Sequence, residues 1–303
     1  MPLADRKIVD SLVDWPDTAP DPAGATTTSA TQSDGLPIYV DFANSVIDID
    51  DLKGADAGQI ERRHYSGLIG RLKRLVSPIK ESTLENTQAF MRALKATNPE
   101  PVVLVIGGGT VGQGMDALYE DPAIKLVALD IYPSPEIHFV ADAHNIPIQN
   151  GAFDGVVVQA VLEHVLRPEV VVAEIWRVLK PGGLVYAETP FMQQVHEGPY
   201  DFTRFTESGH RYLFRQFDRV TSGSSGGPGT QMIWSIDYLF RGLFRSRKVG
   251  SIAKLAFFWL RYLDHLIPEE YAVDGASGVF FLGKKAAHTI TAKDIIAQYR
   301  GAQ

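Results

Sequence analysis

Glycines that follow a short apolar run are the first feature of the sequence that could bind a ligand. The run 102–106 leads into Gly107, Gly109 and Gly112, an order that indicates a buried strand, a tight turn and then a helix. Glycines at such a turn let a ligand approach the backbone where a Cβ atom would collide with it. Asp130 ends the next apolar run and is placed to accept hydrogen bonds from the two hydroxyls of a ribose. These residues alone could equally indicate NAD or FAD, and a tight turn that binds no ligand is a less favoured alternative.

Three more segments follow in a fixed order and narrow these alternatives. Asp142 stands just beyond a third strand-like segment, Gln159 and Ala160 end a fourth, and Arg177 opens the turn Arg-Val-Leu-Lys-Pro-Gly-Gly. Together with the glycine turn, these motifs resemble the class I S-adenosylmethionine-dependent methyltransferases, with a type 11-like pattern over residues 100–223. An oxidoreductase that uses NAD or FAD is the alternative, but it accounts for neither Asp142 nor the Arg177 turn. A non-catalytic protein that binds S-adenosylmethionine is the third interpretation.

The resemblance implies that seven residues bind the cofactor, S-adenosyl-L-methionine. The glycines would contact its methionine part, Asp130 its ribose and Asp142 its adenine amino group, while two residues after the fourth strand would line the floor near the sulfonium. The complete predicted set is Gly107, Gly109, Asp130, Asp142, Ala143, Gln159 and Ala160.

Two positions depart from the family pattern. The family usually has an acidic residue where this chain has Val105, and a glycine where it has Val111. The acidic residue commonly orients the amino group of the methionine part. The sequence therefore leaves that contact unassigned.

Two histidines are the candidates for a catalytic base. Methyl transfer from a sulfonium is a direct displacement, in which the enzyme chiefly aligns the acceptor, the methyl group and the sulfur. A base is needed only if the acceptor must lose a proton. His164 follows the fourth strand and His196 the fifth, where such sheets bind their ligands. A hydrogen-bonded structural role is the simpler explanation of each ring, and His196 is the better candidate of the two. No metal site is expected, because the nearby candidates match no tetrahedral zinc spacing. These candidates are His196, Glu197, Asp201 and His210.

The segment 239–263 combines basic and aromatic residues without any acidic residue, in a chain whose net charge is −7. Two functional interpretations are open: the segment could lie on an anionic membrane surface, or form a lid over a lipid-like or anionic acceptor. The more ordinary interpretation, which we favour, is a helical cap whose aromatic face packs on the sheet with its arginines in solvent.

The elements that must position these residues alternate between strand and helix. Apolar runs at 102–106, 126–129, 155–158 and 184–187, separated by helical patterns, predict a Rossmann-like doubly wound sheet of about seven strands. The sheet should be mostly parallel with an antiparallel last strand at 278–283, preceded by a helical insertion over 231–275. Ser82 and Glu85 are expected to form the capping box of a helix.

The expected domains are an N-terminal extension, a methyltransferase domain and a tail. The extension, 1–80, would hold a disordered linker at 15–34 and a helix over 59–76. The methyltransferase domain would span 81–290, and the tail 291–303.

Composition restricts the partners and the compartment. The chain has 303 residues and no cysteine, which excludes disulfides, thiolate zinc sites and a cysteine nucleophile. Without a signal peptide or a membrane-spanning apolar run, a cytoplasmic protein is expected, at most peripheral to a membrane. The acidic charge, and the absence of the Asn/Asp-Pro-Pro-Tyr motif of nucleic-acid amino-methylating enzymes, favour a small-molecule, lipid or sugar-linked acceptor over nucleic acid.

Overall fold

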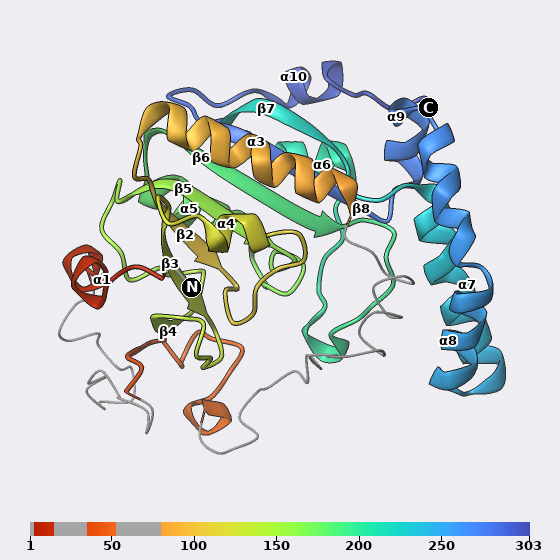
Figure 1. The fold of residues 1–303 in the computed structure, drawn as a ribbon, viewed down its shortest axis with the longest axis horizontal. Helices are drawn as coiled ribbons and strands as arrows, with labels where there is room; N and C mark the ends of the chain where they lie inside the picture. Colours follow the sequence, from red (N-terminus) through yellow and green to blue (C-terminus); the bar gives the residue numbers. More distant parts are fainter. Residues whose placement is uncertain (1–2, 15–34, 53–79) are drawn as a thin grey trace.

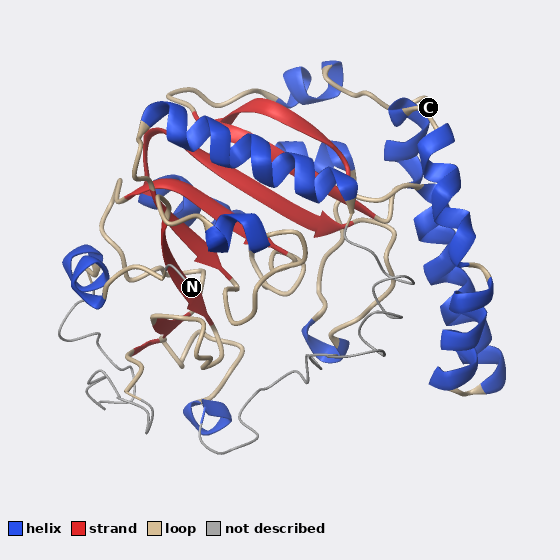
Figure 2. Ribbon diagram, viewed as in Figure 1, coloured by secondary structure: helices blue, strands red, loops and turns tan. Residues whose placement is uncertain are grey.

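One sheet carries the fold of the chain (Figures 1 and 2). The computed structural model describes residues 3–14, 35–52 and 80–303. The strand order across the sheet is β1-β4-β3-β2-β5-β6-β8-β7. The strands are β1 (Ile38–Tyr39), β2 (Val102–Ile106), β3 (Lys125–Asp130), β4 (Phe139–Ala141), β5 (Phe153–Gln159), β6 (Leu179–Pro190), β7 (Phe217–Ser224) and β8 (Gly278–Lys285). About seven strands are predicted, and the described residues form eight, with the two-residue β1 at one edge.

Strand direction and order create one crevice near the middle of the sheet. β8 is antiparallel to β6 and to β7, and every other neighbouring pair is parallel. From β2 the chain proceeds to β3 and β4 on one side, and then crosses to β5 and β6 on the other. Ligands of doubly wound sheets bind at the carboxyl ends of the strands beside such a reversal. The predicted Rossmann-like fold with an antiparallel last strand is confirmed.

Burial on both faces explains why β2 is an uninterrupted apolar run. Leu104 and Ile106 belong to the core on one face, while Val103 and Val105 belong to the core on the other. Successive side chains of a strand point to opposite faces, so an entirely apolar strand must be covered on both sides.

Helices provide this cover (Figure 1). On one face lie α3 (Glu81–Thr97) and α4 (Asp116–Glu120). On the other lie α1 (Arg6–Leu12), α5 (Pro168–Val178) and α6 (Glu207–Leu213). The predicted capping box of Ser82 and Glu85 is wrong. Helix α3 begins at Glu81, so Ser82 lies inside its first turn, and the N-cap residue Lys80 has no acceptor side chain.

The insertion forms a helical layer beside the sheet (Figure 2). Its elements are α7 (Pro228–Phe244), α8 (Arg247–Ala256), η3 (Phe258–Leu266), α9 (Glu269–Ala272) and η4 (Val273–Gly275). Helix α7 packs against α8 and η3, and these elements contact one another more than they contact the strands. Within the segment 239–263, the aromatic residues Phe244, Trp259 and Tyr262 are 60%, 49% and 52% exposed. The favoured expectation, an aromatic face packed on the sheet, is therefore wrong, because the pattern of apolar residues does not say which surface covers them.

Segments from both ends of the chain join this unit. The backbone N–H of Ala4 donates to Leu126 in β3 at 2.8 Å, and Val9 of α1 is buried in the core. After α10 (Ala292–Ala297), the Tyr299 hydroxyl donates to Asp274 at 2.8 Å. The boundaries at residues 80 and 290 stay predictions, and the expected linker 15–34 and helix 59–76 lie outside the described residues. Among the described helices, none has the length and apolar content needed to cross a lipid bilayer.

Candidate active site

A cavity of about 1110 Å³ opens at the carboxyl ends of β2, β3, β5 and β6. Most of the residues predicted to bind the cofactor or to act in catalysis line it together. They are Gly107, Asp130, Asp142, Ala143, Gln159, Ala160, His164 and His196. Gly109 is the exception, because it does not line the cavity and contacts Asp130 instead. The role of each residue in binding stays a prediction, but the sheet brings them to one place.

The glycine turn is fastened to the end of β3. Gly107 adopts a φ of +76°, in the left-handed region that favours glycine, and its N–H donates to Leu129 at 3.0 Å. The N–H of Gly109 donates to Oδ2 of Asp130 at 2.9 Å, and that of Tyr132 donates to Oδ1 at 3.2 Å. Two backbone donors therefore fix the orientation of the Asp130 carboxylate at the wall of the cavity.

Asp142 is held in the ionised form. Burial alone would raise the pKa of its carboxyl, but hydrogen bonds from His144 and Ser45 outweigh burial and lower that pKa. Nδ1 of His144 lies 2.6 Å from Oδ1, and the His144 N–H donates to the same oxygen at 2.9 Å. The Ser45 hydroxyl donates to Oδ2 at 3.3 Å. An ionised acceptor at this position suits the amino group of an adenine.

A buried carboxylate that the sequence did not single out connects the ends of β5 and β6. Glu188 is 5% exposed, lines the cavity and accepts from the Thr83 hydroxyl at 2.6 Å and from the Tyr186 hydroxyl at 2.5 Å. Burial first, and then Glu188, raises the pKa of Tyr186, so its phenol keeps the proton that it donates. The side-chain amide of Gln159 donates to Oε2 of Glu188 at 3.1 Å.

Ala160 adopts a backbone conformation that is uncommon for a residue with a Cβ atom. Its φ is 53°, in the left-handed region, and its N–H donates to the carbonyl of Glu188 at 2.9 Å. Such strained residues gather at functional sites, where the surrounding structure holds them in place. The strain lies at the predicted floor of the cofactor site, where β5 ends.

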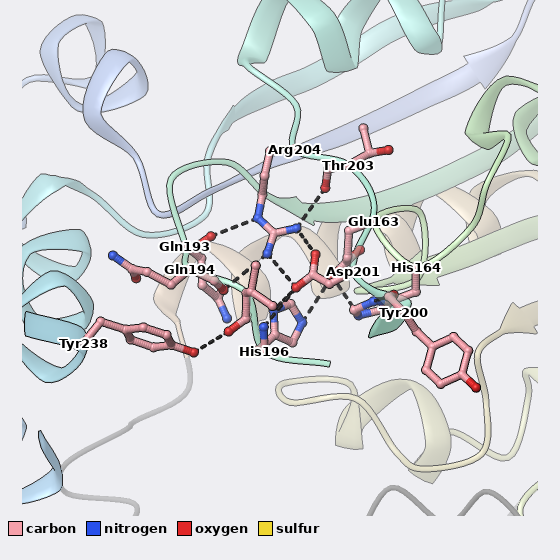
Figure 3. Close-up of polar contacts among 11 residues, drawn as sticks. Glu163, His164, Gln193, Gln194, His196, Tyr200, Asp201, Thr203, Arg204 and Tyr238 are labelled. Atoms are coloured by element: carbon pink, nitrogen blue, oxygen red, sulfur yellow. Dashed lines mark hydrogen bonds and ion pairs between the residues drawn. The ribbon is translucent and has the colours of Figure 1, made fainter. Parts of the chain in front are cut away.

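Glu163, His164 and His196 form a second group, the Glu–His–His cluster, in the same cavity (Figure 3). Glu163 and His164 lie in the turn after β5, and His196 lies in the loop before η2 (Gly198–Tyr200). Oε1 of Glu163 is 3.6 Å from Nε2 of His164 and 3.7 Å from Nε2 of His196. The two imidazole rings meet edge to face, with their centroids 4.9 Å apart.

Glu163 is the most unusual member of the cluster. It is 0% exposed, and no hydrogen bond from another residue of the described chain reaches either carboxylate oxygen. Burial raises the pKa of Glu163 to about 8, against smaller lowering effects that include Arg204. Because nothing in its local sequence marks it as buried, sequence reasoning missed it, although it directly precedes a predicted catalytic residue.

The loop before α6 orients His196. Nδ1 of His196 lies 3.3 Å from Oδ2 of Asp201, and the Arg204 guanidinium binds both oxygens of the same carboxylate (Figure 3). Burial would raise the pKa of Asp201, but the hydrogen bond from Arg204 outweighs burial and helps to lower that pKa to about 2. Asp201 is therefore a permanent acceptor for the His196 ring.

Two other residues weighed from the sequence take structural places. His210 does not line the cavity and is packed among the rings of Phe205, Phe214 and Phe281. Arg177 donates to the carbonyl of Ile146 at 2.8 Å, and so fastens the end of α5 to the loop after β4.

Part of the chain is similar in sequence to known methyltransferases. Residues 104–187 match a family model described as a methyltransferase domain. A demethylmenaquinone methyltransferase of Renibacterium salmoninarum is 34% identical over 141 residues, which make up 43% of this chain and 55% of that protein. The chain thus aligns with just over half the length of this curated relative.

Solved methyltransferase structures are similar to the chain at low sequence identity. Phosphoethanolamine N-methyltransferase 2 of Haemonchus contortus, in complex with S-adenosyl-L-methionine, has a TM-score of 0.45 and 14% identity, covering 75% of this chain and 59% of its own. Geranyl diphosphate C-methyltransferase of Streptomyces coelicolor has a TM-score of 0.43 and 12% identity, covering 67% of this chain and 76% of its own. We draw no functional argument from similarity at this level.

The family match and the observed fold lead to the same class of protein. The matched residues run from β2 to β6, across the reversal of the sheet where the predicted cofactor residues lie. Residues 104–187 thus match a methyltransferase domain, in agreement with the class I S-adenosylmethionine-dependent methyltransferase that the motifs predict.

Proposed function

We propose that the protein transfers the methyl group of S-adenosylmethionine to a small-molecule acceptor bound in the same cavity. The observation that carries this proposal is the division of the cavity into two chemically different parts. One part presents the glycine turn and the carboxylates of Asp130 and Asp142, and the other presents the Glu–His–His cluster. The volume of about 1110 Å³ exceeds the usual upper limit of about 1000 Å³ for a ligand pocket, as two ligands side by side would require.

The residues of the first part fit the cofactor. Asp130 and Asp142 both present carboxylate acceptors to the cavity, suited to ribose hydroxyls and to an adenine amino group. Glu188 and Gln159 lie beside the glycine turn and supply the acidic and amide groups that Val105 does not. We assign the methionine amino group to Glu188. When bound there, S-adenosylmethionine supplies a methyl group that the sulfonium charge has already activated.

The residues of the second part act on the acceptor. Nδ1 of His164 faces the carbonyl of Tyr200 at 2.7 Å, and a carbonyl only accepts, so this nitrogen carries a proton. Burial lowers the pKa of His164, which keeps the ring neutral and leaves a lone pair on Nε2. Nε2 of His196, in the loop before η2, also faces Oε1 of Glu163, at 3.7 Å. These nitrogens hold an acceptor hydroxyl or amine by accepting its proton in a hydrogen bond, and so align it with the methyl group.

The surface beside the cavity supports a lipid-like acceptor. Arg247, at the start of α8, and Lys80 both line the cavity, so its mouth carries cations. Helices α7 and α8 continue from that mouth with exposed apolar residues, among them Leu243 and Ile252. Basic residues beside exposed apolar ones are typical of surfaces that lie on anionic lipid. The curated relative is named a demethylmenaquinone methyltransferase, and this name describes a small-molecule acceptor.

Calorimetric titration with S-adenosylhomocysteine tests the cofactor assignment first. We expect micromolar binding, with a loss of about tenfold or more in Asp130→Ala, because that variant lacks the charged acceptor of the ribose. NAD, titrated in parallel, should not bind. Binding of NAD in place of S-adenosylhomocysteine would restore the oxidoreductase interpretation.

A transfer assay with labelled methyl donor then tests the activity. Pools of quinols, phenols and amines, each with and without a lipid tail, are the acceptors to screen. His196→Ala should keep the affinity for S-adenosylhomocysteine and lose turnover. Binding of the cofactor without transfer to any pool would favour a non-catalytic binding protein.

A further inference from the structure

We propose that Glu163, His164 and His196 bind a divalent transition-metal ion of the zinc type. The sequence predicts no metal site, and the group weighed there included Asp201 and His210, which are not ligands in this inference. The inference concerns the ion itself and does not depend on methyl transfer.

The distances within the cluster suit one small ion. Metal–ligand bonds of about 2.0–2.2 Å in a tetrahedral arrangement place neighbouring ligand atoms about 3.4 Å apart. Oε1 of Glu163 lies 3.6 Å and 3.7 Å from the two Nε2 atoms, and all the ligand atoms lie within 4.8 Å of one another. The two distances from Glu163 are within a few tenths of an ångström of this value, and rotation of the imidazole rings would bring the two Nε2 atoms to it.

The buried carboxylate is the second, independent observation. Glu163 is fully buried, and neither of its oxygens has a hydrogen-bond partner on another described residue. Burial of an unpartnered carboxylate is strongly unfavourable, and buried charges are normally paired or bound to metals. Arg204 is not its partner, since that guanidinium binds Asp201. An ion between the carboxylate and the two rings would satisfy Glu163.

The histidines are also oriented as metal ligands are. Ligand histidines almost always direct their second ring nitrogen at a carbonyl or a carboxylate, which fixes the tautomer and the ring orientation. Here Nδ1 of His164 faces the carbonyl of Tyr200 at 2.7 Å, and Nδ1 of His196 faces Asp201 at 3.3 Å. Both lone pairs on Nε2 are thereby directed toward Glu163.

The ligand set selects the class of metal. Two imidazoles and one carboxylate suit zinc and its neighbours among the transition metals, whereas magnesium and calcium prefer oxygen ligands alone. With three protein ligands, a tetrahedral ion keeps one open position, as catalytic zinc sites do. The cluster lines the cavity, so this position is open to an oxygen of the acceptor, which the bound ion would hold in place of the two Nε2 lone pairs. That last step alone rests on the proposed function.

Metal binding by the full-length protein tests the inference. After treatment with a chelator, the protein is titrated with zinc alone in competition with a chromophoric chelator. We expect one ion per chain. Glu163→Gln and His196→Ala should each weaken binding by at least about 100-fold, whereas Asp201→Asn, which weakens the support of His196 and the ion pair with Arg204 but removes no ligand, should cost about 10- to 100-fold. His288→Ala removes an exposed histidine outside the cluster and serves as the matched control.

Cobalt binding can be measured on the wild-type protein, so this test does not depend on whether a variant folds. Cobalt bound to two imidazoles and a carboxylate in a four-coordinate site should give intense visible absorption, which zinc displaces. Absence of one-to-one zinc binding, or unchanged binding in Glu163→Gln, would overturn the inference. Titration with S-adenosylhomocysteine on the same samples separates this failure from a failure of the proposed cofactor site.

Discussion

The backbone N–H of Gly109 donates a hydrogen bond to Oδ2 of Asp130 at 2.9 Å, and a Cβ atom on Gly109 would lie 2.6 Å from that same oxygen. The glycine that the sequence assigns to the cofactor therefore acts through the carboxylate. Its missing side chain leaves the space that Asp130 occupies, and its amide fixes the orientation of Asp130 toward the cavity.

Gly109→Ala should weaken the binding of S-adenosylhomocysteine by about tenfold or more, because Asp130 must leave its position and lose a charged hydrogen bond. Calorimetry gives the affinity. Gly242→Ala is the matched control, since a Cβ atom there meets no atom within 4 Å. An unchanged affinity in Gly109→Ala would show that the Asp130 carboxylate does not contact the ligand.

Glu188→Gln should weaken S-adenosylhomocysteine by about 10- to 100-fold, if the carboxylate binds the amino group in place of an acid at Val105. Methylthioadenosine lacks the amino-acid part, so its affinity should be the same for the variant and the wild type. Glu169→Gln, in the first turn of α5, is the control for loss of one negative charge. An equal loss for both ligands would mean that Glu188 is structural.

The sequence predicts the strands and the cofactor side of the cavity well, because both depend on local pattern. The apolar run 102–106 becomes β2 with the same limits, since a strand covered on both faces needs apolar residues throughout. Asp130 is the last residue of β3 and Asp142 directly follows β4, so the parallel order of the sheet brings them to one edge.

The other side of the cavity depends on residues that are distant in the chain. Glu163 is buried by the loop that carries His196 and Asp201, and Glu188 accepts from Thr83 in α3. No local spacing reveals such contacts. In the helical insertion, the periodicity of apolar residues predicts the helices but not which residues are buried, since Leu266 is exposed.

Substitution of exposed apolar residues of the insertion should reduce attachment to lipid. Leu243→Ser with Ile252→Ser removes two side chains that are 68% and 67% exposed on α7 and α8. Each side chain that enters the interface contributes about 1 kcal/mol or more, so partitioning onto anionic vesicles should fall by about tenfold or more. Vesicle flotation at low and high salt gives the measurement, and salt should weaken wild-type binding.

Ile296→Ser is the control for this experiment, because Ile296 is 76% exposed and belongs to α10, which lies apart from α7 and α8 (Figure 1). It should leave flotation unchanged. Equal flotation of the double variant and the wild type, or binding to neutral vesicles as strong as to anionic ones, would contradict a basic lipid-binding surface.

His210 should make the fold sensitive to acid. The ring is 1% exposed among phenylalanines, its Nε2 has no hydrogen-bond partner in the described chain, and burial lowers its pKa to about 3. In the unfolded chain the histidine pKa is about 6.5, so below that pH the unfolded state binds a proton that the folded state does not. The contribution of the neutral His210 ring to stability is therefore fully present above about pH 6.5. It falls with decreasing pH, by about 1.4 kcal/mol for each pH unit, until the pKa of the folded state is reached.

His210→Leu removes this titration and keeps an apolar side chain of similar volume. Urea unfolding at pH 7.0 and pH 4.5 gives the free energy of unfolding for both proteins. The wild type should lose about 2 kcal/mol more than the variant over this interval, because other groups, including buried His138, titrate in both proteins and cancel in the difference. Parallel losses in the two proteins would show that the buried ring accepts a proton without unfolding.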